Sequence, residues 1–450
     1  RLNNMVTYRD LAHQVNKKRR IWPIRKLVAN HSEELFQLIP CWMASPESVS
    51  TIFPMKEMFD IVIFDEASQC FTEKGLPAMC RGQQVVITGD SKQLRPNDLY
   101  RPRYEEESDE GIDLEVESLL ELAENYLMQV KLLGHYRSNA LELIDFSNQH
   151  FYNHQLKLLP DREDINRHEP AIKYIKVDGV WEKNTNLIEA QKVIELLLEI
   201  LDSDPLKEIG VVTFNAKQQE LISDLFEAAL IERKRAIPKN IFIKNIENVQ
   251  GDEKDIIIFS TAYAPDTSGR LTMQFGSLNM ENGENRLNVA VTRARQKVII
   301  ISSINPQQLK VEQSKNIGPK LLKAYLNYAL EVSEGRYVPS IAPDTSTSKN
   351  WYLKKKILEN YTFSGVELSN ELPFGDITLK ERDNYLGVLL TDDDLYYQNP
   401  SMKDAHVYMR FSLGKKNWKF KGIFSREYWS NKSDVEESIN RFINHHKSEE

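Results

Sequence analysis

The sequence predicts an α/β fold built on parallel sheets and divided into several domains. Short, unbroken apolar runs recur at 61–64, 85–88, 210–214, 255–260 and 298–301. Strands of a parallel sheet are covered on both faces, so they read as continuous apolar runs and not as alternating patterns. Amphipathic helical patterns lie between the runs, and a length of 450 residues is enough for about three domains.

Composition and charge narrow the class of protein. The chain is 41% hydrophobic and 28% charged, which is ordinary for a globular protein and excludes disordered or collagen-like chains. No apolar run approaches the ~18 residues of a membrane span and no signal segment opens the chain, so we expect a cytoplasmic protein without a membrane partner. Three cysteines outside any CxxC pattern favour reduced thiols. A net charge of −8 disfavours a wholly basic nucleic-acid coat but permits a basic groove.

Two breaks in the pattern divide the chain. Residues 104–117 are crowded with carboxylates, which repel one another and indicate an exposed connection after a first domain at 1–125. The stretch 334–349 is rich in Pro, Ser and Thr and reads as a linker. We therefore expect a second domain at 126–333 and a separate module at 350–450.

An acidic pair follows the first apolar run. Asp65 and Glu66 stand at the carboxyl end of a predicted strand, where the ligands of open parallel sheets bind. In nucleotide hydrolysis one carboxylate can hold Mg²⁺ while the other takes a proton from the attacking water. Such a pair can equally cap a helix, and the pair alone does not decide between these interpretations.

A second polar group follows the next apolar run. Gly89 permits a tight turn, Asp90 can join the surroundings of a metal, and the amide of Gln93 can contact a γ-phosphate. A simple turn at the end of a strand is the alternative. Two polar groups at two successive strand ends nevertheless favour a shared site.

Basic residues are grouped in the second half of the α/β region. Arg286 and Arg293 are seven positions apart, which predicts that they share one face of a two-turn helix. Two arginines can neutralise the charge that develops in phosphoryl transfer, a role worth ~10³ or more in rate. A solvated basic helix face is the alternative. Arg137 is expected to open an amphipathic helix, and Gly251 lies in a loop before a strand, with Glu253 beside it.

Taken in order, these segments resemble the motifs of superfamily 1 helicases of the Upf type, over about residues 40–310. The segments DEAS, GDSKQL, HYRS, VQGDEKD and RLNVAVTRAR match motifs II, III, the motif IV region, V and VI. The resemblance implies two RecA-like domains that hold one ATP and Mg²⁺ between them. It also implies movement along nucleic acid from 5′ to 3′.

The resemblance further implies roles for single residues. Those at the nucleotide are Asp65 on Mg²⁺, Glu66 as catalytic base, Gln93 at the γ-phosphate, Arg137 and Arg293 as arginine fingers, and Glu253 near the ribose, with Asp90, Gly251 and Arg286 as further nucleotide-binding candidates. The candidates for contacts to nucleic acid are Ser45, which precedes the DEAS strand, and Thr213 and Thr261, which end strands of the second domain. For both threonines a purely structural role is the alternative.

One family motif is missing from the 450 residues: there is no GxxxxGK[ST] loop. Without it the chain has no backbone cradle for the β-phosphate, no lysine charge and no hydroxyl for Mg²⁺. In the family this loop lies upstream of DEAS. We therefore expect either a P-loop on an upstream segment or separate chain, or a loss of ATP chemistry. The Arg at position 1 favours the first, and the 450 residues alone should hydrolyse ATP weakly or not at all.

The C-terminal segments 374–397 and 402–429 resemble endonucleases of the very-short-patch-repair type, within the PD-(D/E)xK fold. The resemblance places Asp376 at the metal-binding Asp and Leu389 at the second acidic ligand. Leucine cannot bind a hard cation, so a second ligand would have to come from Asp392, Asp393 or Asp394, just beyond the predicted strand. Two interpretations of this module are possible: an active nuclease, or a degenerate module that binds nucleic acid or has a structural role. The degenerate module is favoured.

These observations lead to two hypotheses of different classes. The first is an ATP-dependent helicase or translocase on a single-stranded track, with DNA favoured over RNA because a nuclease-like module follows. The second is a non-catalytic nucleic-acid-binding or interaction subunit that keeps the two-lobed fold and needs no ATP.

Overall fold

The computed structural model describes residues 5–96, 118–338 and 352–447, except 373, 398 and 400. The predicted acidic connection at 104–117 lies outside the described residues, as does most of the predicted linker. The chain forms two compact units, 1–131 and 132–450, which are described separately. Among the described residues, no helix combines the length and apolar character that crossing a bilayer requires.

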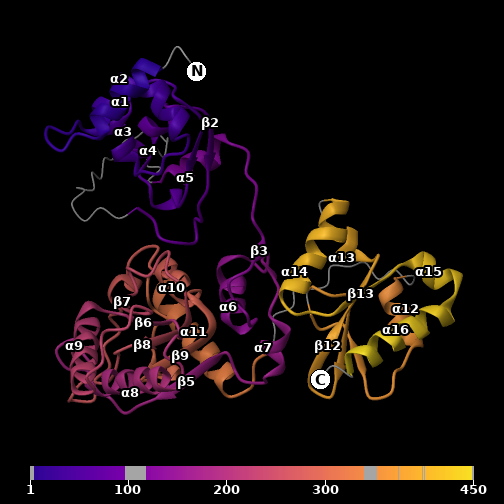
Figure 1. The fold of residues 1–450 in the computed structure, drawn as a ribbon. Coiled ribbons are helices and arrows are strands. Elements are labelled where there is room, and N and C mark those ends of the chain that lie inside the picture. Colours follow the sequence, from indigo (N-terminus) through magenta and orange to yellow (C-terminus); the bar gives the residue numbers. More distant parts are fainter. Residues whose placement is uncertain are drawn as a thin grey trace, which may run out of the picture. The chain divides into compact units, whose positions relative to one another are not determined.

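The first unit is a two-stranded parallel sheet with helices (Figure 1). Strand β1 (Phe59–Phe64) pairs with β2 (Gly82–Ile87) in parallel. The helices are α1 (Met5–Val15), α2 (Ile24–Leu38), α3 (Pro46–Ile52), α4 (Thr72–Met79), α5 (Leu119–Tyr126) and the 3₁₀ turn Ala67–Gln69. Alternate side chains of the strands, including Phe64, pack with α4 and α5 in one apolar cluster.

The other face of this sheet is open within the described unit. Ile61, Ile63 and Val86 are 45%, 64% and 43% exposed. The prediction that both apolar runs are buried on two faces is therefore wrong here. The physical reason is that successive strand side chains point to opposite faces, and the helices of the unit cover only the face that carries Phe64.

The second unit contains a five-stranded, fully parallel sheet in the order β5-β9-β8-β6-β7. The strands are β5 (Ile172–Lys176), β6 (Ile209–Thr213), β7 (Ile241–Asn245), β8 (Lys254–Ser260) and β9 (Ala294–Ser302). Strand β6 is buried throughout, and β8 and β9 are buried over most of their length. Here the prediction of strands covered on both faces is confirmed.

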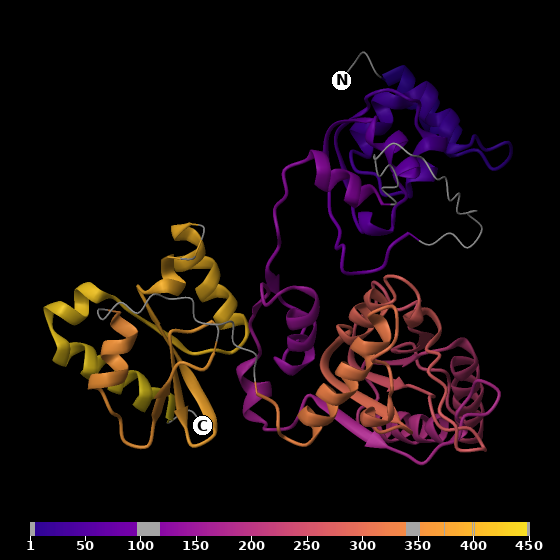
Figure 2. The ribbon, with the colours of Figure 1, turned by 180° about the vertical axis from the view of Figure 1, so that it is seen from behind.

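Helices cover both faces of the five-stranded sheet. Apolar residues of α8 (Leu187–Ser203) and α9 (Ala216–Glu232) share one cluster with β6, β8 and β9. Helix α11 (Gly318–Ser333) lies on the other face, where the ring of Tyr325 meets Phe259 of β8. Figure 2 shows the same layers from behind. The remaining elements are the short strands β3 (Gly134–His135) and β4 (Lys157–Leu158), the helices α6 (Glu142–Phe151), α7 (Arg162–Asn166) and α10 (Glu284–Val291), and the 3₁₀ turns Gly276–Asn279 and Pro306–Gln308.

The C-terminal part of the second unit is a small mixed sheet in the order β10-β11-β12-β13. The first two pairings are antiparallel and the last is parallel. The strands are β10 (Glu367–Ser369), β11 (Ile377–Glu381), β12 (Asn384–Thr391) and β13 (Phe420–Ile423). The helices are α12 (Leu353–Asn360), α13 (Asp394–Tyr397), α14 (Met409–Lys415), α15 (Ser425–Ser430), α16 (Lys432–Lys447) and the π turn Asp404–Tyr408. We call residues 352–447 the C-terminal module.

The C-terminal module shares a core with residues 139–168 of the same unit. Leu141, Ile144 and Leu158 form one buried apolar cluster with Val388 and Trp418 of the module. The indole Nε1 of Trp418 donates to the Pro160 carbonyl at 2.8 Å. The module is therefore docked on this segment by both apolar packing and hydrogen bonding.

Candidate nucleotide-binding site

The first unit brings the ends of β1 and β2 together. The Thr88 hydroxyl donates to Oδ1 of Asp65 at 3.0 Å. The Ala67 amide donates to the Thr88 carbonyl at 2.8 Å, so the two loops are joined through main chain as well. Asp65 and Glu66 therefore lie beside the loop that carries Asp90 and Gln93.

Glu66 has an unusual backbone conformation. Its φ of 53° lies in the left-handed region, which costs a residue other than Gly roughly 1 kcal/mol or more. Its amide donates to Oδ1 of Asp65 at 3.0 Å. Glu66 occupies the N-cap position of the turn Ala67–Gln69, yet its side chain makes no capping hydrogen bond. The alternative in which this carboxylate serves as a helix cap is therefore not supported.

Gly89 allows the two loops to approach. A Cβ at this position would lie 3.0 Å from the Ser68 amide nitrogen and 3.2 Å from that of Ala67. Beyond the glycine, Asp90 accepts from the Lys92 amide at 2.8 Å and from Nε2 of Gln93 at 3.0 Å. Asp90 thus orients the amide that was expected to face a γ-phosphate.

In the second unit Arg137 lies in the turn between β3 and α6. The sequence pattern predicted that Arg137 opens a helix. This prediction is wrong, because α6 begins only at Glu142. Its Nε donates to Oε2 of Glu253 at 2.8 Å, and its Nη1 donates to the Thr292 carbonyl at 3.4 Å. The hydrogen bond from Arg137 is the main cause that holds the pKa of Glu253 below its usual value.

The prediction that Arg286 and Arg293 share one helix is wrong. Helix α10 ends at Val291, and β9 begins at Ala294. The β-branched run at the end of this segment pairs with β5 and β8, so sheet formation ends the helix early. At the end of the helix the Thr292 hydroxyl donates to the Asn288 carbonyl at 3.0 Å.

The two arginines have different surroundings. Arg293 is 2% exposed, and its Nε donates to the Val289 carbonyl at 2.7 Å. Its Nη2 donates to the Thr292 hydroxyl at 3.0 Å. Arg286 is half-buried and faces Glu247 at 4.0 Å. Gly251 precedes β8 with a φ of +82°, a conformation that favours glycine.

The three predicted nucleic-acid contacts differ in exposure. Ser45 is exposed and caps α3, where its hydroxyl accepts from the Ser48 amide at 3.3 Å. Thr213 is buried and donates to the Asn215 carbonyl at 2.9 Å. Thr261 is buried and shares a hydrogen bond of 3.1 Å with the Ser302 hydroxyl. Both threonine hydroxyls therefore have partners inside the domain.

Sequence reasoning missed a buried carboxylate, Glu189, in the first turn of α8. Its oxygens accept from the amides of Ala262 and Ser303 at 2.7 and 2.8 Å and from the Ser260 hydroxyl at 2.9 Å. Burial raises the pKa of Glu189 to about 7 although these hydrogen bonds oppose the rise. Glu189 ties together the carboxyl ends of β8 and β9. The available signal was Asn186 three residues earlier, which caps the helix.

In the C-terminal module Asp376 is buried at the start of β11. Its Oδ2 accepts from the Thr391 amide at 2.7 Å. Its Oδ1 has no hydrogen-bond partner among the described residues. Burial, helped by the nearby charge of Asp393, raises the pKa of Asp376 to about 6.

The carboxylate beside Asp376 is that of Asp393. Asp393 accepts from the Thr391 hydroxyl at 2.9 Å and from the Lys354 amide at 2.7 Å. Asp392 turns instead to Ser425, whose amide and hydroxyl donate to it at 2.9 and 2.7 Å. Leu389 belongs to the apolar core of the module. Within the described parts of the chain, no three His, Cys, Asp or Glu side chains are grouped as a metal site.

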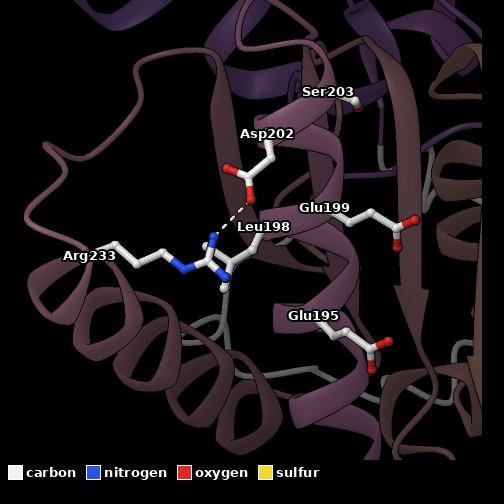
Figure 3. Close-up of a pocket in the computed structure, with 6 residues that line it drawn as sticks. All are labelled: Glu195, Leu198, Glu199, Asp202, Ser203 and Arg233. Carbon is white, nitrogen blue, oxygen red and sulfur yellow. Dashed lines mark hydrogen bonds and ion pairs between the residues drawn. The ribbon is translucent and has the colours of Figure 1, made fainter.

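A surface pocket lies elsewhere, on the helical layer of the second unit (Figure 3). Its lining residues belong to α8, except Arg233, which follows α9. Nη1 of Arg233 donates to Oδ2 of Asp202 across the pocket at 2.9 Å. The lining residues are Glu195, Leu198, Glu199, Asp202, Ser203 and Arg233. None of the predicted site residues lines this pocket.

Comparison with known proteins connects this geometry to helicases. Two family models, each described as an AAA domain, match residues 37–97 and 115–305. An uncharacterized ATP-dependent helicase of Mycoplasma pneumoniae is 31% identical over 92% of this chain and 39% of its own length. One of Mycoplasma genitalium is 34% identical over 75% of this chain and 31% of its own length. One of Methanocaldococcus jannaschii is 28% identical over 55% of this chain and 36% of its own length.

The chain thus spans between about a third and two fifths of the length of these relatives. The first AAA match contains Asp65 and Glu66, and the second contains the five-stranded parallel sheet. The chain is therefore similar to proteins named as ATP-dependent helicases and, in two of its segments, to AAA domains.

Proposed function

We propose that this chain supplies the metal-binding carboxylate, the catalytic base and the arginine side chains of an ATP-dependent DNA helicase that moves 5′ to 3′. The observation that carries the proposal is the junction of two strand ends in the first unit. There the Thr88–Asp65 hydrogen bond places Glu66 beside the loop of Asp90 and Gln93. A non-catalytic subunit would not require an acidic pair at this edge of a parallel sheet.

The residues present fit ATP and Mg²⁺. Asp65 is exposed, and among the described residues only its Oδ1 accepts hydrogen bonds. The other oxygen is thus open to Mg²⁺, which supplies charge neutralisation when bound. Glu66 would take a proton from the attacking water. Arg137 and Arg293 would neutralise the charge that develops on the transferred phosphoryl group.

We propose that a segment carrying a P-loop completes this site and covers the open face of β1 and β2. Ile61, Ile63 and Val86 form an apolar surface on that face. Parallel sheets are almost always covered on both sides, because their strands bury both rows of side chains. An α/β segment with a GxxxxGK[ST] loop would cover this surface and supply the missing contacts to the β-phosphate.

For the nucleic-acid track we propose single-stranded DNA. Ser45 is the accessible one of the three proposed contacts, whereas Thr213 and Thr261 would act by holding strand ends in place. A forked duplex tests both nucleic acid and direction. The full natural protein should separate a DNA fork with a free 5′ single strand faster than one with a free 3′ single strand. Equal or reversed preference would contradict the proposed direction, and equal unwinding of an RNA fork would contradict the preference for DNA.

The C-terminal module is proposed to be nuclease-like and unable to cut. Two observations support this: Leu389 fills an apolar core, and Asp392 is engaged by Ser425. Asp376 and Asp393 alone are a poor site for Mg²⁺, which demands near-octahedral oxygen coordination. Plasmid DNA incubated with the protein and Mg²⁺ or Mn²⁺ should stay intact. Nicking that is lost in Asp376→Ala and kept in Asp392→Ala would show a live nuclease that uses Asp376.

A further inference from the structure

The C-terminal module touches the segment that follows Arg137. Three consecutive module residues, 416–418, provide several of the contacts. The Lys416 Nζ donates to Oδ1 of Asn139 at 2.9 Å, and Nδ2 of Asn417 donates to Oδ2 of Asp161 at 3.0 Å. Trp418 adds the hydrogen bond to the Pro160 carbonyl and the apolar core beneath it. A continuous loop of the module is therefore bound to one short stretch of the second unit.

Asn139 is the residue through which this contact reaches the proposed nucleotide site. Its amide donates to the Arg295 carbonyl at 2.9 Å, and its carbonyl accepts from the Asp161 amide at 2.7 Å. Asn139 lies two positions after Arg137, and Arg295 lies two positions after Arg293. Lys416 therefore holds the side chain of Asn139, and the main chain of Asn139 bonds to the strand that follows Arg293.

His135 closes the turn from the other side of Arg137. The Ser138 amide donates to Nε2 of His135 at 3.1 Å, so residues 135 to 138 form a hydrogen-bonded turn that contains Arg137. Burial and, after it, the positive charges of Arg137, Lys416 and Arg293 together lower the pKa of His135 to about 4. A neutral ring can accept this hydrogen bond at neutral pH, whereas a protonated ring could not.

We propose that Lys416 is a positioning residue for Arg137, so that docking of the C-terminal module sets the efficiency of phosphoryl transfer. The inference rests on the proposed function, because it takes Arg137 to be an arginine finger. Glu253 and the Thr292 carbonyl hold the guanidinium. The contact between Lys416 and Asn139 holds the main chain from which that side chain extends.

The expected effect follows from the geometry. Loss of the ammonium group would leave the Asn139 side chain without this donor and allow the turn to relax. A misplacement of about 1 Å in a group that neutralises transition-state charge can cost up to about 10² in rate. Because Arg137 would act in the transition state, the loss should appear in kcat and not in the KM for ATP.

The first experiment uses the 450-residue chain and measures the environment of His135 by NMR of its ring Cε1–H during a pH titration. The wild-type midpoint should lie near pH 4. Lys416→Ala should raise the midpoint because it removes a neighbouring positive charge, and Lys416→Arg should restore it. Lys432→Ala, a lysine of the same module at the start of α16, is the matched control and should change nothing. An unchanged midpoint in Lys416→Ala would overturn the proposed positioning role of Lys416.

The second experiment measures steady-state ATP hydrolysis by the full natural protein. Lys416→Ala and Asn139→Ala should each lower kcat about tenfold with KM within about twofold, and the double variant should be no worse than either alone. Lys416→Arg should recover most of the rate, and Lys432→Ala should match the wild type. If ATP hydrolysis depends on Glu66 but is unchanged in Lys416→Ala and in Asn139→Ala, the positioning role is overturned and the proposed function is kept. Absence of any Glu66-dependent activity would overturn the proposed function, and this inference with it.

Discussion

Arg137 and Glu253 form a hydrogen-bonded ion pair, with Nε 2.8 Å from Oε2, although 116 positions separate them in the chain. The pair joins the turn after β3 to the loop before β8. Both side chains are partly exposed, so the pair itself should stabilise the fold by no more than about 1 kcal/mol. The contribution of Arg137 should therefore be seen in catalysis far more than in stability.

Replacement of Arg137 tests that contrast. Arg137→Ala should lower the kcat for ATP by about 10³, since an arginine finger contributes on that scale. Its free energy of unfolding should change by about 1 kcal/mol or less. Steady-state kinetics and chemical denaturation of the same preparation measure both quantities. A large loss of stability with an unchanged kcat would show that Arg137 has a structural role and not a catalytic one.

Arg293 should behave differently because it is buried. Arg293→Ala removes the donor to the Val289 carbonyl and the contact with the Thr292 hydroxyl. Hydrogen bonds from a charged group contribute about 1.5–3 kcal/mol each, so this variant should lose stability as well as activity. Arg286→Ala is the matched control, since Arg286 is a half-buried residue facing Glu247 at 4.0 Å. Equal stability in both variants, by calorimetry, would argue against the buried role of Arg293.

The buried carboxyl of Glu189 predicts a pH dependence. Its pKa is raised from 4.5 to about 7 in the folded protein. Its contribution to stability is therefore complete below about pH 4.5 and is lost as the pH rises through 7. Glu189→Gln has no such titration, so the stability advantage of the wild type over this variant should shrink by about 3 kcal/mol between pH 4.5 and pH 8. Calorimetry across this range would contradict the account if the difference stayed constant.

Trp418 should be the anchor of the docked module. Trp418→Ala removes a buried aromatic side chain and should cost about 3–5 kcal/mol, whereas Trp418→Phe should cost roughly 1 kcal/mol for the lost hydrogen bond to Pro160. Trp429→Ala is the control, because Trp429 is 57% exposed. Limited proteolysis should release the module from Trp418→Ala first. Equal resistance of Trp418→Ala and Trp429→Ala would contradict this role.

Sequence reasoning succeeded where one local rule was enough. The continuous apolar runs of β6, β8 and β9 predicted a covered parallel sheet, because burial on both faces leaves no polar positions. The same rule failed for β1 and β2. Their second face is open within the described unit, and a run of apolar letters does not show what covers it.

The remaining differences arise from tertiary structure. The spacing of Arg286 and Arg293 fits a helix, yet pairing of β9 with its neighbours ends the helix at Val291. Glu189 gave no strong signal, since its partners come from strand ends far along the chain. The contact between Lys416 and Asn139 joins residues 277 positions apart, and no local pattern predicts it.

The central claim is that Glu66 acts as the base in ATP hydrolysis, and one measurement tests it most directly. ATP turnover by the full natural protein is followed with and without single-stranded DNA, together with binding of a fluorescent ATP analogue. Glu66→Gln should bind the analogue as the wild type does and lose at least about 10² in turnover, because an amide keeps the shape but cannot take a proton. DNA-stimulated turnover that is unchanged in Glu66→Gln would contradict the account.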